Sequence, residues 1–278
     1  MSERVYDLHC HSTASDGILA PADLVVRAKS RGVTHLSLTD HDTVSGLASA
    51  ADAAEHEGIQ LIHGIEFSTQ WKASGIHVVG LNIDPEHTSI HQAIQRQEST
   101  RSERARSIAE RLETKHGIAD AYDGARRYAD GVVGRPHFAR YLMELGLVST
   151  MNAAFNQYLG RGKAGDVPLE WLDLADVISA ISASGGVAVL AHPGKYKFTL
   201  TKLRRLVEHF KGSGGRAIEV VSGNQSVNDT NSFADIAEQF NMLASSGSDF
   251  HVPGQPWQEL GSQTALPSRC TPVWSAWV

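Results

Sequence analysis

The sequence predicts an α/β fold in which strands and helices alternate along the chain, as they do in parallel α/β barrels. Up to Leu81, two amphipathic helical segments separate short apolar strands, and the alternation resumes after residue 172. Polar side chains, histidines above all, follow the strands at their carboxyl ends. Parallel α/β barrels carry their reactive groups at these strand ends, so the pattern indicates an enzyme-like site.

Local signals place the individual elements. Pro21 stands near the start of the first helix, Gly32 follows its end, and Gly58 stops the second helix. Alternating apolar residues mark the strands. In chain order we expect a strand at 5–11, a helix at 22–31, a strand at 33–39, a helix at 44–57, strands at 59–62 and 76–81, a helix at 173–184, a strand at 186–190, a helix at 200–211, a strand at 217–221, a helix at 232–240 and a strand at 243–246.

The region 89–165 has a different character. Residues 91–115 form a long charged helical stretch with opposite charges at three- and four-residue spacing, and Gly134-Arg135-Pro136 breaks the helical pieces that follow. Residues 160–168 read as a loop. We therefore predict a barrel formed by 1–88 and 166–278, with a helical insertion at 89–165 that covers the site. The Trp-containing segment 262–278 either completes the barrel or makes an interface.

The composition excludes several classes of protein. A net charge of −6 argues against a globally basic nucleic-acid binder, and a hydrophobic fraction of 41% suffices for a large core. Two cysteines fit a reducing compartment better than a disulfide framework. The first residues lack a signal-peptide pattern, and no apolar run approaches the roughly 20 residues of a membrane span. We expect a cytoplasmic protein without a membrane partner.

The stretch from Tyr6 to Gly17 contains the strongest local signal. His9 and His11 stand two apart on a predicted strand, so both imidazoles face one point while Cys10 faces the other way. Asp16-Gly17 then places a carboxylate in a turn that can fold back over that point. Two nitrogens and one oxygen make half of a divalent-metal site. We give Cys10 no catalytic role.

Further candidate ligands stand at or just beyond other strands. They are His41 beside Asp40, Glu66, His77, His192, Asp249 and His251. Burying so many imidazoles and carboxylates costs several kcal/mol unless a cation or hydrogen bonds compensate, so one shared polynuclear site explains them together. His35, inside a strand, is expected to be structural. A nitrogen and oxygen ligand set favours Mn²⁺, Fe²⁺ or Zn²⁺ in an open catalytic site.

These residues, taken in order, resemble the polymerase-and-histidinol-phosphatase (PHP) family. The matching motifs are His9-Cys10-His11, Asp16-Gly17, Thr39-Asp40-His41-Asp42, Gly64-Ile65-Glu66, His77, Ala191-His192-Pro193 and Ser248-Asp249-Phe250-His251. The resemblance implies a distorted seven-stranded (β/α) barrel holding two to three divalent ions, manganese first among them. It implies one metal between His9, His11, Glu66 and Asp249, a second at Glu66, His77 and His192, and a third at Asp16, His41 and His251.

Within the family, the length and the charged insertion resemble the bacterial nucleoside 3′,5′-bisphosphate phosphatases, which overlap with 5′→3′ exoribonucleases. That likeness implies substrate-binding residues at Asp16, His41, Arg101, Ser102, Glu103, Arg104 and Arg135, and catalytic roles for Asp16, His41, Glu66, His192 and Asp249. For most arginines of the insertion, a solvated helix face is the alternative. Arg135 differs because a Gly-Arg-Pro turn holds a guanidinium fork rigidly. Lys195 either assists at the site or lies on the surface.

The implied reaction is removal of the 3′-phosphate from nucleoside 3′,5′-bisphosphates, or release of 5′-mononucleotides from short 5′-phosphorylated RNA. An RNA 5′ end presents the same arrangement, so one geometry serves both reactions. The proton donor to the leaving group stays open between Asp249, His192 and metal-bound water. Three alternatives remain: a histidinol-phosphate phosphatase, a non-catalytic metal-binding module like the barrel of some DNA polymerases, and an amidohydrolase. The last commonly uses a carboxylated lysine where Glu66 stands here.

Overall fold

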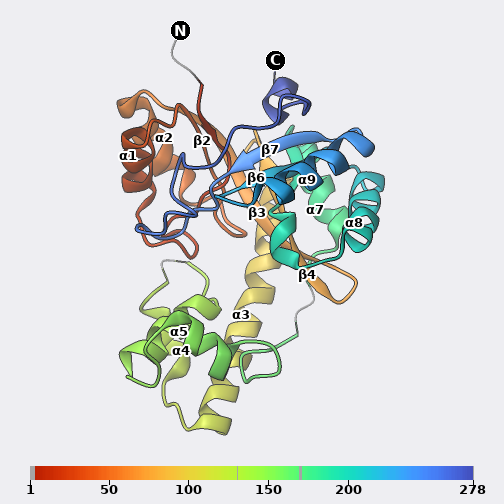
Figure 1. Ribbon diagram of the computed structural model, residues 1–278. Helices are drawn as coiled ribbons and strands as arrows, with labels where there is room; N and C mark the ends of the chain where they lie inside the picture. The colour runs from red at the N-terminus through yellow and green to blue at the C-terminus, as the bar shows by residue number, and fades with distance from the viewer. Residues whose placement is uncertain (1–3, 130, 169–170, 278) are drawn as a thin grey trace.

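Seven strands form one sheet that is nearly closed into a barrel in the computed structural model, which describes residues 4–129, 131–168 and 171–277 (Figure 1). Neighbours in the sheet follow chain order. The strands are β1 (Tyr6–Asp7), β2 (His35–Leu38), β3 (Gln60–Trp71), β4 (Ser74–Leu81), β5 (Val187–Leu190), β6 (Ala217–Ser222) and β7 (Leu243–Gly247). The predicted seven-stranded α/β barrel is confirmed.

The barrel closes where the chain beyond β1 meets the chain beyond β7. The Leu8 N–H donates to the Ser246 carbonyl at 3.1 Å, and the Asp249 N–H donates to the His9 carbonyl at 2.8 Å. A Cβ placed on Gly247 would lie 2.3 Å from the Cβ of His9, so only glycine permits this approach. Closure therefore brings His9 beside Asp249, two residues that are 240 positions apart in the sequence.

The parallel pairing expected from the strand-helix alternation does not hold for β4. This strand runs antiparallel to both β3 and β5, whereas the pairs β1–β2, β2–β3, β5–β6 and β6–β7 are parallel. The connection from Trp71 to Ser74 is too short for a crossover, and such a link permits only a hairpin. The strand β3 is also longer than predicted, so Glu66 lies within it.

Five helices flank the barrel strands in the sequence: α1 (Pro21–Ser30), α2 (Leu47–Glu57), α7 (Leu174–Ala183), α8 (Leu200–Gly212) and α9 (Val227–Gln239). Each buries an apolar stripe, as α8 does with Leu203, Leu206, Val207 and Phe210. The helix α9 begins before the predicted start at residue 232, because Ser226 caps it by accepting the Asp229 N–H at 3.1 Å.

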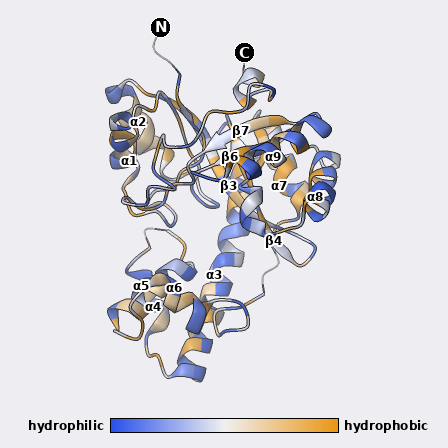
Figure 2. Cartoon of the chain, viewed as in Figure 1, coloured by the Kyte–Doolittle hydropathy of each residue, from blue (hydrophilic) through white to orange (hydrophobic). Residues whose placement is uncertain are grey.

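The charged region forms a separate group of helices: α3 (Thr88–His116), α4 (Ala121–Arg126), α5 (Arg135–Glu144), α6 (Met151–Ala154) and the π-helical turn η1 (Phe155–Leu159). They share a hydrophobic cluster drawn from residues 105–164, while Ile90 and Ala93 in the first turns of α3 pack into the barrel core. Figure 2 shows the mostly hydrophilic surface of α3 linking the two parts. Arg135 is the first residue of α5, and the predicted Gly-Arg-Pro break is a helix start.

The C-terminal segment packs on the barrel. The Ala244 N–H in β7 donates to the Thr271 carbonyl at 2.8 Å, and Trp274 in the short helix η3 (Val273–Trp277) stacks on Tyr6 with ring centroids 4.0 Å apart. The segment therefore extends the β7 edge and covers the start of β1. Among the described residues, no helix has the length and apolar character needed to cross a bilayer.

Candidate metal centre

All nine side chains proposed as ligands converge at one end of the barrel. Their ligand atoms form four overlapping groups, within each of which the atoms lie within 4.8 Å of one another. The groups are His11, Asp16, His41 and His251; His9, Glu66 and His192; His9, His11 and Asp249; and His41, Glu66 and His77. The extended segment after β1 points His9 and His11 to the same side, as predicted, while Cys10 is buried in the core on the other side.

Glu66 lies at the centre of the cluster. Its Oε2 atom is 3.1 Å from Nε2 of both His9 and His11 and 3.2 Å from Nδ1 of His41. Its Oε1 atom is 2.9 Å from Nδ1 of His77 and from Nε2 of His192. One carboxylate thus faces two sets of imidazoles with its two oxygens, which is the arrangement a bridging ligand requires.

The ligand atoms fit a divalent cation. In the part of the chain that the structure describes, the buried atoms without a hydrogen-bond partner include Nε2 of His9, both ring nitrogens of His11, Nδ1 of His41 and Oε2 of Glu66. Native proteins rarely leave such atoms unpaired, because each costs about 1–3 kcal/mol. Here the unpaired lone pairs point at one another across a shared space, so cations at that place would satisfy several of them at once.

The electrostatics follow from burial and from mutual contact. Burial raises the pKa of Glu66, but the charges of His9, His41 and His77 outweigh it and hold the pKa well below its ordinary value. Burial lowers the pKa of His9, yet the carboxylates of Glu66 and Glu219 raise it to about 10. Burial lowers the pKa of His192 to about 4, so this imidazole is neutral and ready to act as a ligand.

Metal binding is expected to release a proton from His9. Because the pKa of His9 lies above that of free imidazole, the metal-free protein is protonated there at neutral pH, and a metal must displace that proton. Apparent affinity should rise about tenfold per pH unit until pH reaches the pKa. Titration calorimetry with Mn²⁺ in buffers of different ionisation enthalpy measures the release directly. Glu219→Gln should reduce it, and heats that do not depend on the buffer would contradict the expectation.

The Asp40 carboxylate does not join the cluster and instead holds the backbone beside it in place. Asp40 accepts hydrogen bonds from the Ser12 N–H and hydroxyl at 2.7 and 2.6 Å and from the Ser15 hydroxyl at 2.6 Å. These bonds fix the turn before Asp16, and the Asp16 carboxylate lies 3.2 Å from Nε2 of His251. The predicted turn at Asp16-Gly17 therefore does fold back toward the histidines.

Glu219 contacts two of the candidate ligands, although no role was predicted for it from the sequence. It lies on β6, 3.1 Å from Nδ1 of His9, and accepts the His192 N–H at 2.5 Å. A carboxylate on the far nitrogen of a ligand histidine fixes the tautomer and turns the other nitrogen toward the metal. The available signal was a charged residue inside the apolar run Ile218-Glu219-Val220-Val221.

Lys195 and Tyr196, which follow His192-Pro193 in the chain, also lie at the site. The Tyr196 hydroxyl accepts the His77 N–H at 3.0 Å and donates to the Ala191 carbonyl at 2.8 Å, so it joins the ends of β4 and β5 beside two ligands. The Lys195 ammonium contacts the Asp249 carboxylate. Lys195 is therefore located at the cluster. His35, in contrast, stacks on Tyr6 away from the cluster, as expected.

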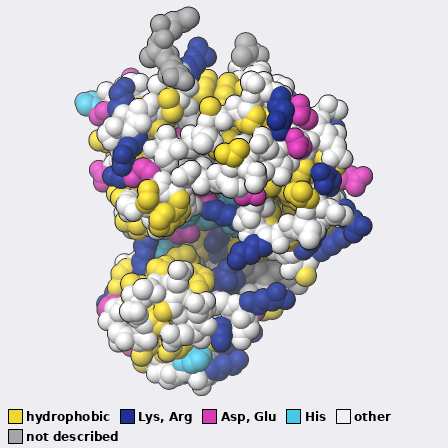
Figure 3. All heavy atoms as spheres, viewed as in Figure 1, with side chains coloured by type: hydrophobic (Ala, Val, Ile, Leu, Met, Phe, Trp, Pro, Cys, Tyr) yellow, Lys and Arg dark blue, Asp and Glu magenta, His cyan; other side chains and the backbone are white. Residues whose placement is uncertain are grey.

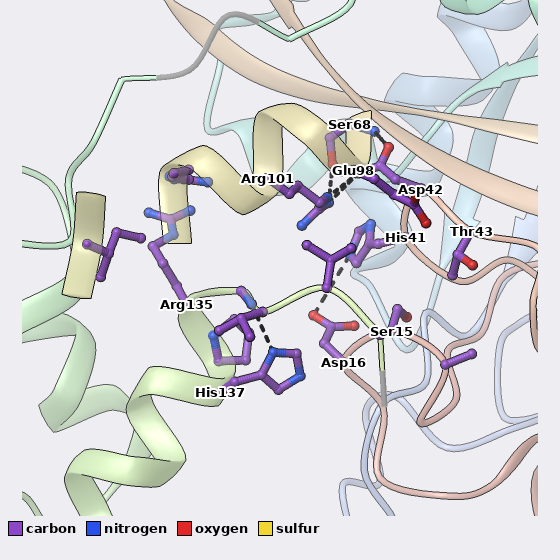
Figure 4. Close-up of a pocket in the computed structure, with 18 of the residues that line it drawn as sticks. Ser15, Asp16, His41, Asp42, Thr43, Ser68, Glu98, Arg101, Arg135 and His137 are labelled. Carbon is purple, nitrogen blue, oxygen red and sulfur yellow. Dashed lines mark hydrogen bonds and ion pairs between the residues drawn. The ribbon is translucent and has the colours of Figure 1, made fainter. Parts of the chain in front are cut away.

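A cavity of about 430 Å³ opens between the cluster and the helices of the insertion. Its wall includes Asp16, His41 and His77 from the barrel, Arg101 and Arg104 from α3, and Arg135 and His137 from α5. Figure 3 shows a hollow with Lys and Arg side chains at this level, and Figure 4 shows Arg101 and Arg135 facing Asp16 and His41 across the space. Ser102 and Glu103 are not among the lining residues, and Glu103 is exposed.

The cavity wall brings three guanidinium groups of the insertion close together, those of Arg101, Arg104 and Arg135. Arg101 is paired with Asp42, whereas neither Arg104 nor Arg135 forms an ion pair within the described parts of the chain. Burial, together with the charges of Arg135 and Arg101, lowers the pKa of Arg104 to about 9. Its Nε atom is buried and has no hydrogen-bond partner among the described residues. A bound anion would relieve this repulsion, so the cavity is suited to phosphate.

An α/β barrel with a buried cluster of imidazoles and carboxylates beside an arginine-lined cavity is the arrangement expected of a metal-dependent phosphoester hydrolase. The chain belongs to the PHP domain family, whose sequence profile matches residues 7–221.

Two relatives align with almost the whole chain. It is 46% identical over 269 residues to a 5′-3′ exoribonuclease of Haemophilus influenzae, covering 97% of each protein. It is 43% identical over 270 residues to a 3′,5′-nucleoside bisphosphate phosphatase of Chromobacterium violaceum, covering 96% of this chain and 94% of the relative. A solved structure from Chromobacterium violaceum, described as an amidohydrolase with bound sulfate and no metal, superposes with a TM-score of 0.91 at 42% identity, covering 98% of this chain and 95% of the other.

Proposed function

We propose that this protein removes the 3′-phosphate of nucleoside 3′,5′-bisphosphates and releases mononucleotides from the 5′ end of short 5′-phosphorylated RNA. The observation that carries the proposal is the composition of a single cavity. One wall holds ligand residues of the metal cluster, and the opposite wall holds three arginines from the insertion. A substrate with two phosphates fits such a cavity better than a simple phosphomonoester does.

The residues divide into two groups by role. Divalent ions at the cluster, with manganese the ion we propose, would supply an activated water and neutralise the phosphate under attack. His9, His11, Asp16, His41, Glu66, His77, His192, Asp249 and His251 would hold two to three of them. Arg104 and Arg135, together with the outer edge of Arg101, would bind the phosphate that is not cleaved.

The neutral histidines are suited to binding a metal. Burial keeps the pKa values of His41, His192 and His251 below that of free imidazole, so these rings accept a metal or a hydrogen bond at neutral pH. Asp16 keeps its charge because His251 and His41 outweigh the effect of burial and hold its pKa well below the ordinary value. Asp16 lies on the cavity wall, where its carboxylate would help to hold a metal ion beside the substrate.

We propose that residues 89–165 act as a cap over a barrel made of 1–88 and 166–278, and that the protein acts in the cytoplasm. The separate hydrophobic cluster of the insertion supports the first point, and two buried free cysteines are consistent with the second. The names of the two relatives describe the two proposed reactions, and both reactions place a 5′-phosphate next to a 3′ phosphoester.

The direct test compares three substrates with Mn²⁺ present. These are adenosine 3′,5′-bisphosphate, a short RNA with a 5′-phosphate and the same RNA with a 5′-hydroxyl. Turnover of the first two and much slower turnover of the third would support the proposal. Histidinol phosphate serves as the comparison substrate, because it has no second phosphate for the arginines. Preferential hydrolysis of histidinol phosphate would be consistent with the metal site but would reject the proposed substrate. Inactivity on all four substrates would favour a non-catalytic binding module.

A further inference from the structure

Three successive residues after β2 face three different parts of the molecule. Asp40 holds the turn that carries Asp16, through Ser12 and Ser15. His41 joins the metal cluster. Asp42 turns to the insertion, and its carboxylate contacts α3. These three residues thus connect the turn, the cluster and the insertion. The contact between Asp42 and the insertion is not part of the metal site.

The Asp42 carboxylate is almost completely buried, and both of its oxygens accept hydrogen bonds. Its Oδ1 atom accepts the Ser68 N–H at 2.8 Å and the Gln97 side-chain amide at 2.9 Å. Its Oδ2 atom accepts Nε of Arg101 at 2.5 Å and also contacts Nη2 of the same guanidinium. Its side chain is 1% exposed. Asp42 also has a positive φ of 54°, a conformation that costs energy and is common at functional sites.

Gln97 strengthens the same contact from α3. Its amide donates to both the Asp42 carboxylate and the Ser68 carbonyl, and its side-chain oxygen accepts the Leu172 N–H at 3.3 Å. The residue is fully buried. Gln97 lies one helical turn before Arg101. Its hydrogen bonds therefore fix the position of α3 against β3, and with it the position of Arg101.

Arg101 is held on three sides and open on the fourth. Its Nη2 atom donates to the Ser68 hydroxyl at 2.7 Å, and its guanidinium carbon lies 5.0 Å from the ring centroid of Trp171. The Nη1 atom faces the start of α5, where a Cβ placed on Gly134 would lie 4.0 Å from it. Figure 4 shows the guanidinium fixed to Asp42 on one edge, with its other edge toward the cavity.

We propose that Asp42 is a positioning residue that keeps the phosphate-binding arginine Arg101 at a fixed distance from the metal ligands, and so sets the preference for substrates that carry a second phosphate. This inference rests on the proposed function. His41 and Asp42 are adjacent, so any displacement of the arginine relative to the cluster must strain this loop. Asp42 acts through Arg101 and does not bind substrate itself.

The test is a double-mutant cycle with Asp42→Asn and Arg101→Gln, measured with adenosine 3′,5′-bisphosphate and with 4-nitrophenyl phosphate. Asp42→Asn should raise KM for the bisphosphate about 10- to 30-fold, and KM for the aryl phosphate much less. In the Arg101→Gln background the same change should raise KM by no more than roughly twofold, because the group it positions is already absent. Equal effects of Asp42→Asn in both backgrounds would overturn the proposal.

Two further measurements keep the test decisive. Calorimetric binding of the bisphosphate to the metal-free protein should weaken in Asp42→Asn, with no contribution from turnover. Ser68→Ala removes only a hydroxyl that accepts from Arg101; it should raise the same KM by a smaller factor, and it replaces Asp42→Asn if that variant fails to fold. If Asp42→Asn leaves the calorimetric affinity unchanged and Ser68→Ala leaves KM unchanged, the proposal is overturned.

Asp40→Asn is the matched control, since Asp40 is equally buried and also flanks His41. It should lower metal content by loosening the Asp16 turn, whereas Asp42→Asn should keep the wild-type metal content. Loss of metal in Asp42→Asn would overturn the positioning role. If the wild-type protein prefers histidinol phosphate to the bisphosphate, the proposed function fails; if it prefers the bisphosphate and Asp42→Asn affects both test substrates equally, only the present inference fails.

Discussion

Replacing Glu66 by glutamine is expected to remove two metals at once and to lower kcat/KM for every phosphoester by at least about a thousandfold. Glu66 belongs to two of the four ligand groups, one with His9 and His192 and one with His41 and His77. The amide keeps the shape of the side chain but supplies one neutral oxygen in place of two charged ones. Metal content per chain, measured by plasma mass spectrometry, gives the result independently of activity.

The control for this variant is Glu259→Gln. Glu259 is a buried glutamate outside the cluster, where it binds Arg27 at 2.6 Å and Arg31 at 3.1 Å. This change should lower the free energy of unfolding and leave the number of metals per folded chain unaltered. Wild-type metal content in Glu66→Gln would reject the bridging role, and loss of metal in both variants would show that the losses reflect general destabilisation.

Local patterns predicted the α/β alternation and the candidate ligands at the strand ends, and the resemblance to the family supplied the seven-stranded barrel and the set of nine. A histidine at a strand end, or two histidines at a spacing of two, can be interpreted without knowing what lies opposite. The orientation of β4 was missed because the preceding strand was predicted to end at residue 62, which left a long connection to the strand at 76–81. In the structure β3 continues to Trp71, and the short link from there to Ser74 forces a hairpin.

The residues around the cluster could not be predicted in the same way. Glu219 contacts His9 across 210 positions of sequence, and Gln97 contacts Asp42 across 55. Such pairs exist only once the barrel has closed and α3 has docked, so no local pattern identifies the partner of either residue. Arg135 was singled out for its rigid backbone, and the structure gives a different source of rigidity, the first turn of a helix.

Replacing Arg135 by alanine is expected to raise KM for adenosine 3′,5′-bisphosphate about a hundredfold while changing KM for 4-nitrophenyl phosphate by roughly twofold or less. Burial lowers the pKa of Arg135, the field of Asp166 raises it, and Arg101 lowers it further, so the guanidinium is held among other cations with only partial compensation. Its guanidinium carbon lies 5.8 Å from the ring centroid of Phe155, and within the described residues Arg135 forms no ion pair, so its donors can reach an anion in the cavity. An aryl phosphate occupies only the metals and does not use this group.

Arg106→Ala provides the charge-matched control for Arg135→Ala. Arg106 belongs to α3 but is exposed, and it packs over Tyr122 outside the cavity wall. Its loss should alter KM for neither substrate, which separates a specific contact from the general loss of one positive charge. If Arg135→Ala weakens both substrates equally, the arginine supports the fold of α5. If only the bisphosphate is affected, the second phosphate is bound by the insertion, and the metal cluster and the arginines together select the substrate.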